Sequence, residues 1–598
     1  MQKKISPHSF HLPVMGIAFT IDSPIKIAKY GISSVISIVD DVLIEKMNEY
    51  YSTKFKIPYQ SISTKVEDFR AKRITSYLNT VDTIVKQKFE ILKKNFEEKN
   101  GEFEKYIDML PDFSELKQNF IHTIQHNTLK EDLNNWIQKN LKLGSIDVNI
   151  MTKLDKANYN KNEMLPSEFN DAHAALRGFA NSNLESSVIL SAGMNPRLYS
   201  YFENFSDFFP DEENYLKKKI ILKVSDYRSA IIQGKFLAKK GLWVSEYRIE
   251  SGLNCGGHAF ASDGYLLGPI LEEFKMNKTN LIAEIHNILV EGLKIKEKHV
   301  PSSPLNMDVT VQGGVGTSEE HEFLINNYNI DSVGWGSPFL LVPEATSVDS
   351  TTRKILQKAT EKDLYLSDIS PLGVPFNSLR ENTNEIIKNQ RIGENNPGSS
   401  CPKKFLVSNT EYTERAICTA SKQYQTKKLI DLKLEELNSS EYAKKFQQIT
   451  EKACLCVGLS NAALIENDIK RSGEEQGVAI CPGPNLAYFS KKLSLKEMVA
   501  HIYGKINVIE TNNRPHMFIK ELSMYVNYFS NKVDEFKGSF TVKNEKYLNT
   551  FQNNLNDGIE YYYHLFSSFE SNKENLLNEL ETLKEELFKI KIPILVKL

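Results

Sequence analysis

The chain has 598 residues, of which 41% are hydrophobic and 25% charged, and its formal net charge is −2. The length exceeds what one compact core holds, so we expect two or three domains. The near-neutral charge provides no basic field for nucleic acid or anionic lipid, and no run of about 18 apolar residues predicts a membrane span. Six cysteines are too few for a disulfide scaffold in a chain of this length, which favours a cytoplasmic setting.

The first forty residues predict two strands around one short helix. An apolar run over 12–19 predicts the first strand, and the β-branched run over 33–40 predicts the second. Between them, Ser23 and Pro24 occupy the cap and first position of a helix over 23–30. Such a unit makes the two strands parallel neighbours.

Residues 41–142 interrupt this pattern. Apolar residues recur at helical spacing over 66–99 and again over 113–143, among many lysines and glutamates. We therefore expect a helical insertion over 41–142. The charge pattern alone is typical of solvated helix faces, while a lid, a dimer arm and a partner site are the functional alternatives.

The β/α pattern then resumes and supplies six further strands. These are predicted at 144–151, 187–195, 219–226, 242–250, 308–316 and 331–340. Helices are expected between them at 168–180, 228–240, 280–296 and 318–328. Eight strands alternating with helices predict an α/β fold, a (β/α)8 TIM barrel over 1–40 and 143–390. A linker follows Arg391, and residues 391–598 predict a mainly helical C-terminal region.

Two loops carry glycines where barrels of this class often bind phosphate, after strands seven and eight. They hold Gly313 and Gly314 in the first loop and Gly334, Gly336 and Ser337 in the second. Bare amides suit a phosphate dianion, although a plain turn is the better explanation of each glycine pair taken alone. A cofactor with a flat ring and a phosphate would use both loops. Flavin mononucleotide (FMN) is the first candidate, and a sugar phosphate is its rival.

The sixth strand ends in a glycine turn that carries a histidine. Gly256 and Gly257 precede His258, and adjacent glycines let a backbone approach a flat ligand closely. An imidazole at a strand end can take or give a proton near neutral pH, which makes His258 the candidate catalytic residue. The alternative interpretation is a tight turn with a surface histidine.

The C-terminal region contains five of the six cysteines: Cys401, Cys418, Cys454, Cys456 and Cys481. Thiolates gathered from loops can hold an iron–sulfur cluster or zinc. The spacings match no standard ligand pattern, so the sequence favours buried free thiols over a metal site.

Together these segments resemble the flavin-dependent nitronate monooxygenases (2-nitropropane dioxygenases) and the related class II enoyl-acyl-carrier-protein reductases. Residues 250–258 are similar to the family's Glu-Gly-x-x-Ala/Ser-Gly-Gly-His motif, with one residue inserted. Residues 146–151 resemble its Gly-Val-Asn-Ile motif, and 312–315 its Ala-Gly-Gly-Ile phosphate loop. Residues 336–339 resemble its Gly-Thr-x-Phe motif, and 373–380 its tail.

The resemblance implies an FMN-dependent oxidoreductase, with FMN at the barrel mouth and His258 in proton transfer. It also implies flavin contacts for Gly16 and Asn149. Lys223, at the end of strand five, would stabilise a reduced, anionic flavin, unless it is a solvent-facing loop lysine. Cys255 stands where the family has a small residue, and neither the insertion nor the C-terminal third has a counterpart. The substrate, a small molecule or acyl compound, is therefore not carried over.

Three functions remain open. The leading one is nitronate oxidation with O₂ or enoyl reduction with NAD(P)H. The second is a non-catalytic barrel scaffold whose helical arms bind partners. The third is a flavin enzyme acting on RNA through the lysine-rich insertion, which the near-neutral charge disfavours. A long Glu/Lys/Leu segment over 574–590 would pack as a helix on the body or on a second copy in a homodimer.

Overall fold

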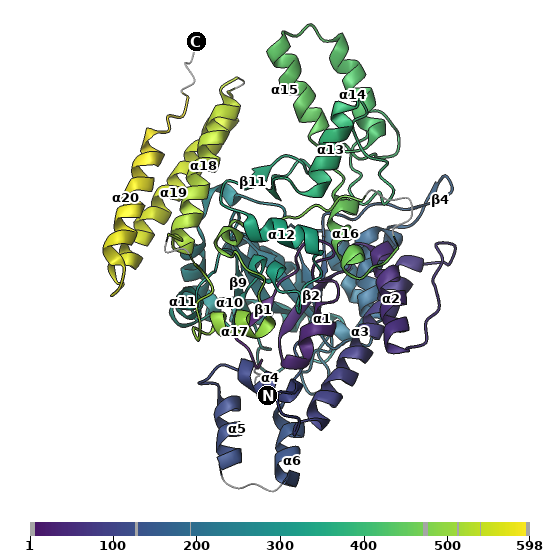
Figure 1. Cartoon of the computed structure of the whole chain (residues 1–598), viewed down its shortest axis with the longest axis vertical. Helices are drawn as coiled ribbons and strands as arrows, with labels where there is room; N and C mark the ends of the chain where they lie inside the picture. The colour runs from purple at the N-terminus through teal and green to yellow at the C-terminus, as the bar shows by residue number, and fades with distance from the viewer. Residues whose placement is uncertain are drawn as a thin grey trace.

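The computed structural model describes residues 6–125, 130–191, 193–470, 476–510, 513–538 and 540–593. Eight strands form a closed barrel at its centre, in the order β1-β2-β3-β6-β7-β8-β9-β10, and every neighbouring pair is parallel. Helices surround the barrel (Figure 1). The predicted (β/α)8 TIM barrel, with helices inserted after the second strand and a helical C-terminal extension, is confirmed.

The barrel strands are short and lie close to the predicted ranges. They are β1 (Phe10–Leu12), β2 (Ser33–Ser37), β3 (Ile146–Ile150), β6 (Ser187–Leu190), β7 (Lys219–Val224), β8 (Val244–Glu250), β9 (Asp308–Gln312) and β10 (Ser332–Gly334). Ala192, in the range predicted for the fourth strand, lies outside the described residues.

Two predicted strands extend too far: the eighth ends at Gly334 and is followed by the helical turn η6 (Ser337–Leu341), and the first overlaps the observed strand only at Leu12. The first strand ends at Leu12 rather than running over 12–19. Pro13 cannot donate a ladder hydrogen bond, and Gly16 adopts a left-handed φ of 54°, which turns the chain. The apolar residues beyond Leu12 are buried by packing in this turn and not by strand pairing.

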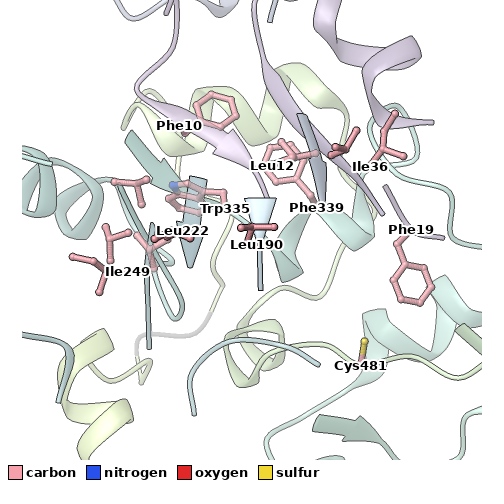
Figure 2. Close-up of a cluster of buried hydrophobic side chains, with 14 of the residues drawn as sticks. Phe10, Leu12, Phe19, Ile36, Leu190, Leu222, Ile249, Trp335, Phe339 and Cys481 are labelled. Atoms are coloured by element: carbon pink, nitrogen blue, oxygen red, sulfur yellow. The ribbon is translucent and has the colours of Figure 1, made fainter. Parts of the chain in front are cut away.

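Side chains along each strand point alternately to the outside and the inside of the barrel. Leu12, Ile36, Leu190, Leu222 and Ile249 come from five different strands and belong to the large core shared with the helices (Figure 2). Ile189 and Ile221, their neighbours in sequence, instead form a small separate cluster with Val35. Successive strand residues point to opposite faces, so this second cluster lies inside the barrel.

Helices cover the outside of the barrel and connect its strands. They are α1 (Ser23–Ile27), η1 (Ala28–Tyr30), η2 (Ser167–Phe169), α7 (Asp171–Ala180), α8 (Pro196–Tyr201), η3 (Phe202–Asn204), η4 (Ser206–Phe208), α9 (Tyr227–Ala238), η5 (Ser262–Gly264), α10 (Leu267–Ile295), α11 (Ser318–Tyr328), η6 (Ser337–Leu341) and α12 (Ser350–Lys358). Helix α11 has the predicted bounds. Helix α10 begins at Leu267, well before the predicted residue 280. Pro269 does not prevent this, because it lies in the first turn of the helix, where proline is tolerated.

The insertion after β2 is helical, as its periodicity predicts, and part of it is core. It contains α2 (Asp41–Phe55), α3 (Phe69–Lys94), α4 (Glu102–Met109), α5 (Glu115–Gln125) and α6 (Lys130–Asn140). Helix α3 buries Ile74, Leu78 and Val81 completely, and α5 and α6 project from one end of the molecule (Figure 1). Lys72, Lys86 and Glu90 of α3 are exposed, as the charge pattern predicts, while its apolar stripe packs on the body.

After α12 the chain adds a hairpin, β11 (Leu364–Ser367) with β12 (Phe376–Leu379), and further helices. These are α13 (Thr383–Gly393), α14 (Lys422–Leu434), α15 (Ser439–Thr450), α16 (Leu455–Glu466), η7 (Pro484–Tyr488), α17 (Leu495–Ile502), α18 (Met517–Phe536), α19 (Val542–Ser567) and α20 (Lys573–Lys589). Helix α13 runs through Arg391, so the linker begins later than predicted. A second small hairpin pairs β4 (Tyr159–Asn160) with β5 (Glu163–Met164).

One continuous apolar core extends through the barrel, the insertion and the C-terminal region. The division of the chain into domains stays a prediction. Among the described helices, none has the length and apolar character needed to span a membrane.

Candidate active site at the barrel mouth

The inner face of β8 is charged. The hydroxyl of Tyr247 reaches α9, where a Cβ added at Gly234 would lie 2.1 Å from it, so Tyr247 points outward. Its neighbours Glu246 and Arg248 therefore point inward. Glu246 accepts hydrogen bonds from Arg248 Nε at 2.8 Å and from Thr310 Oγ1 at 2.5 Å, and burial raises the pKa of this carboxyl. This layer fills the interior of the barrel with a hydrogen-bonded polar network.

A second polar layer lies above it, at the C-terminal strand ends. Lys223 Nζ is 2.7 Å from Glu250 Oε1, which also accepts from Gln312 Nε2 at 2.5 Å. Gln312 Oε1 and Asn149 Oδ1 are buried and have no hydrogen-bond partner among the described residues. An unpaired buried acceptor costs about 1–3 kcal/mol, so a ligand that donates to these oxygens would be stabilised here. Lys223 is 13% exposed, and the alternative of a solvent-facing loop lysine is wrong.

The glycine turn that carries His258 is held by β12. His258 forms an antiparallel bridge with Phe376, and its Nε2 lies 2.7 Å from Ser370 Oγ. The amide of Asn377 donates to Gly257 O at 2.9 Å. His258 is half-buried, unlike a surface histidine. Burial lowers its pKa to about 4, so the imidazole is neutral at pH 7.

A C-terminal segment lies across the mouth and joins the strand-end loops. The carbonyl of Cys481 accepts from Gly257 N at 3.1 Å, and Gly483 N donates to Ser337 Oγ at 2.7 Å. The Cys481 thiol also meets the backbone of Gly257 and Gly16, and burial raises its pKa to about 12. The neutral thiol therefore fills the gap between the loops after the first and sixth barrel strands.

The loops expected to bind a cofactor differ in how much open space surrounds the Cβ positions of their glycines. A Cβ added at Gly257 would have no atom within 4 Å, and one at Gly336 would meet only Pro13 at 3.5 Å and Met15 at 3.9 Å. Gly257 has a φ of 78°, which glycine adopts readily. Open space at the mouth therefore lies beside Gly257 and Gly336.

The loop after β9 is filled by side chains of the protein. A Cβ at Gly313 would lie 2.8 Å from Cys255 Sγ, and one at Gly314 would lie 2.0 Å from Asn254 Nδ2. One at Gly334 would lie 2.7 Å from a β9 side chain. These contacts bring the predicted glycine loops around the same mouth, but they leave no room directly over Gly313 and Gly314.

The six cysteines are free thiols, and those of the C-terminal region are buried. Cys401 and Cys418 are in hydrogen-bond contact with each other. Within the part of the chain that the structure describes, no three His, Cys, Asp or Glu side chains are grouped so that they could hold a metal ion.

Sequence reasoning did not identify Glu250, Gln312, Ser370, Asn377 or Cys481 as site residues. The first two could have been found, because alternation along β8 and β9 places them inward at the strand ends. Asn377 lies in the segment 373–380 that resembles the family's tail, whereas Ser370 and Cys481 reach the mouth only through tertiary contacts, for which the sequence carries no local signal.

The fold and the mouth define a class: a (β/α)8 barrel with a polar upper layer rimmed by glycine loops. No known family profile matches the chain, and no curated protein matches its sequence. Among solved structures, a FabK mutant from Thermotoga maritima is similar at 11% identity and a TM-score of 0.29, covering 67% of this chain and 85% of its own. A likeness this low supports no statement about activity.

Proposed function

We propose that the protein is an FMN-dependent oxidoreductase whose active site is the barrel mouth. The observation that carries the proposal is the upper layer of the barrel. Lys223, Glu250, Gln312 and Asn149 line its inner face, and two of their oxygens are buried acceptors without a partner among the described residues. The motif resemblance of residues 146–151 and 250–258 supports the same assignment.

We place the ring of FMN at this layer, and we place its phosphate away from the loop after β9. A flavin presents an N–H donor that suits the free oxygens of Asn149 and Gln312, and Lys223 provides a cation for a reduced, anionic ring. We assign the phosphate to the loop after β10, where the Cβ position of Gly336 has room. Gly313 and Gly314 offer none. Bound FMN would supply hydride or electron transfer.

His258 is the residue we assign to proton transfer. Its imidazole is neutral at pH 7, because burial lowers its pKa to about 4, and negative charge developing on a bound substrate would raise that pKa and let the ring accept a proton. Ser370 Oγ, 2.7 Å from Nε2, fixes the ring's orientation. The Cys481 segment covers the mouth and excludes water from the reacting groups.

The substrate class separates the two oxidoreductase chemistries. The test is to load the full chain with FMN and measure O₂ uptake with an alkyl nitronate, and separately NAD(P)H oxidation with an enoyl thioester. Turnover in either assay supports the proposal and selects the reaction. A chain that retains no FMN favours a non-catalytic scaffold, and salt-sensitive RNA binding by a flavin-loaded chain favours the RNA alternative.

A further inference from the structure

The first turn of α11 carries a buried carboxylate directly behind the loop after β9. Glu320 is 4% exposed, and its Oε2 accepts from the amide of Gly316 at 2.9 Å. Its Oε1 accepts from the amide of Met517, the first residue of α18, at 2.8 Å. Arg514 donates a hydrogen bond to each oxygen of Glu320, from Nη1 to Oε1 at 2.7 Å and from Nη2 to Oε2 at 2.8 Å.

Arg514 is itself fixed against the loop. Its Nη2 donates to Gly314 O at 2.8 Å, and its Nε donates to Asn485 Oδ1 at 2.9 Å. Asn485 Nδ2 in turn donates to Val315 O at 2.7 Å. A Cβ added at Gly316 would lie 2.6 Å from Arg514 Nε. The guanidinium therefore occupies the space that Gly316 leaves open.

These donors are the set that phosphate groups use in proteins. Backbone amides beside helix N-termini, placed like those of Gly316 before α11 and Met517 at the start of α18, bind phosphate together with the fork of an arginine through charge-assisted hydrogen bonds. Here the same donors all bind the Glu320 carboxylate. Burial alone would raise the pKa of Glu320, but Arg514, His516 and the Gly316 amide hold it below its ordinary value.

We propose that the Glu320 carboxylate is a built-in occupant of an anion site behind the loop after β9, and that it excludes phosphate from that site. The site would then select ligands whose phosphate enters beside Gly336 instead. That consequence for the ligand rests on the proposed function. The occupancy itself depends only on the contacts of Glu320 and Arg514.

The test is rescue of a carboxylate deletion by inorganic phosphate, with the full chain and without FMN. Glu320→Ala leaves Arg514 and two amides without their anion, so phosphate should raise its thermal midpoint in a saturable way. We expect it to bind phosphate at least about tenfold more tightly than the wild type does, at matched ionic strength. Glu319→Ala, next in the chain and exposed, is the matched control and should respond like the wild type.

Arg514 must be required for the rescue, so Glu320→Ala/Arg514→Ala should not respond to phosphate. A folded Glu320→Ala chain whose thermal midpoint does not respond to phosphate overturns the proposal. The proposal is also overturned if the wild type binds phosphate at this site and Arg514→Ala abolishes that binding. If Glu320→Ala does not fold in buffer, recovery of folded protein with added phosphate supports the proposal, and no recovery with phosphate overturns it. Because FMN is absent, none of these outcomes depends on the proposed reaction.

Discussion

At the scale of single residues, His258 is the most direct test of the proposed chemistry. Its Nε2 bonds Ser370 at the mouth, and a neutral imidazole is suited to accept a proton. His258→Ala should retain FMN and lose about 10²–10⁴-fold in kcat, the usual contribution of a general acid or base. Wild-type kcat in this variant would remove His258 from the role.

Glu521, on α18, is a buried carboxyl that supports the turn after β8. It accepts from Ser251 Oγ at 2.5 Å and from the amide of Leu267, the first residue of α10, at 2.9 Å. Burial raises its pKa from 4.5 to about 7. The folded chain therefore keeps this proton up to about pH 7, whereas the unfolded chain loses it near pH 4.5. The stability that protonation provides is complete below pH 4.5 and is lost as pH rises to about 7.

Glu521→Gln should remove this pH dependence, because the amide does not titrate. Between pH 5 and pH 8, the wild-type free energy of unfolding should fall relative to the variant's, by up to about 3 kcal/mol. Urea denaturation at both pH values measures the difference. Parallel pH profiles for the two proteins would show that Glu521 does not titrate in this range.

Part of the site could be predicted at the residue scale. Asn149 and Lys223 lie near the C-terminal ends of β3 and β7, as expected, whereas His258 lies in the turn beyond β8, bridged to Phe376 of β12. The filling of the loop after β9 could not be predicted, because Arg514 lies 200 residues from its partner Gly314 in the chain. Local sequence patterns carry no information about such a contact.

At the scale of elements, a buried ion pair joins the C-terminal region to α2. Lys403 Nζ lies 2.7 Å from Asp40 Oδ2, and the two side chains are 2% and 1% exposed. Asp40 also caps α2 by accepting from the amides of Val42 and Leu43. Removing one partner of such a pair leaves a buried charge without compensation.

Lys403→Met should therefore lower the free energy of unfolding by about 3–5 kcal/mol. Lys404→Met, at the exposed neighbouring lysine, is the control and should change it by less than about 0.5 kcal/mol. Urea denaturation of both variants measures the effect. Equal losses in the two variants would mean that the Asp40 pair contributes nothing specific.

Element positions follow from the sequence where one local rule decides them. Apolar and β-branched runs located the starts of the barrel strands within two residues, and α11 begins at Ser318 as expected. The first strand was misplaced because Pro13 and Gly16 end pairing inside an apolar run that reads as continuous. The apolar spacing over 66–99 predicts the buried stripe of α3, but it does not predict which element the stripe packs on.

At the scale of the whole molecule, the C-terminal region lies on the barrel mouth and not beside it. Gly483 donates to Ser337 across 146 residues of sequence, and Asn485 donates to Val315 across 170. Counting strands predicts the barrel, because each strand is a local pattern. It does not predict this cover, because the cover depends on long-range packing.

The central claim, that FMN binds at this mouth, is tested most directly by a matched glycine pair. The Cβ position of Gly336 has room, so the methyl group of Gly336→Ala should enter the ligand space, and circular dichroism checks that the variant is folded. Gly393, at the end of α13, has nothing within 4 Å of its Cβ position and serves as control.

The measurement is the flavin absorbance retained by each full chain after incubation with FMN and gel filtration. The wild type and Gly393→Ala should carry oxidised flavin bands, and Gly336→Ala should bind FMN at least about tenfold more weakly. A colourless wild type would contradict the account, as would equal FMN binding by all three chains.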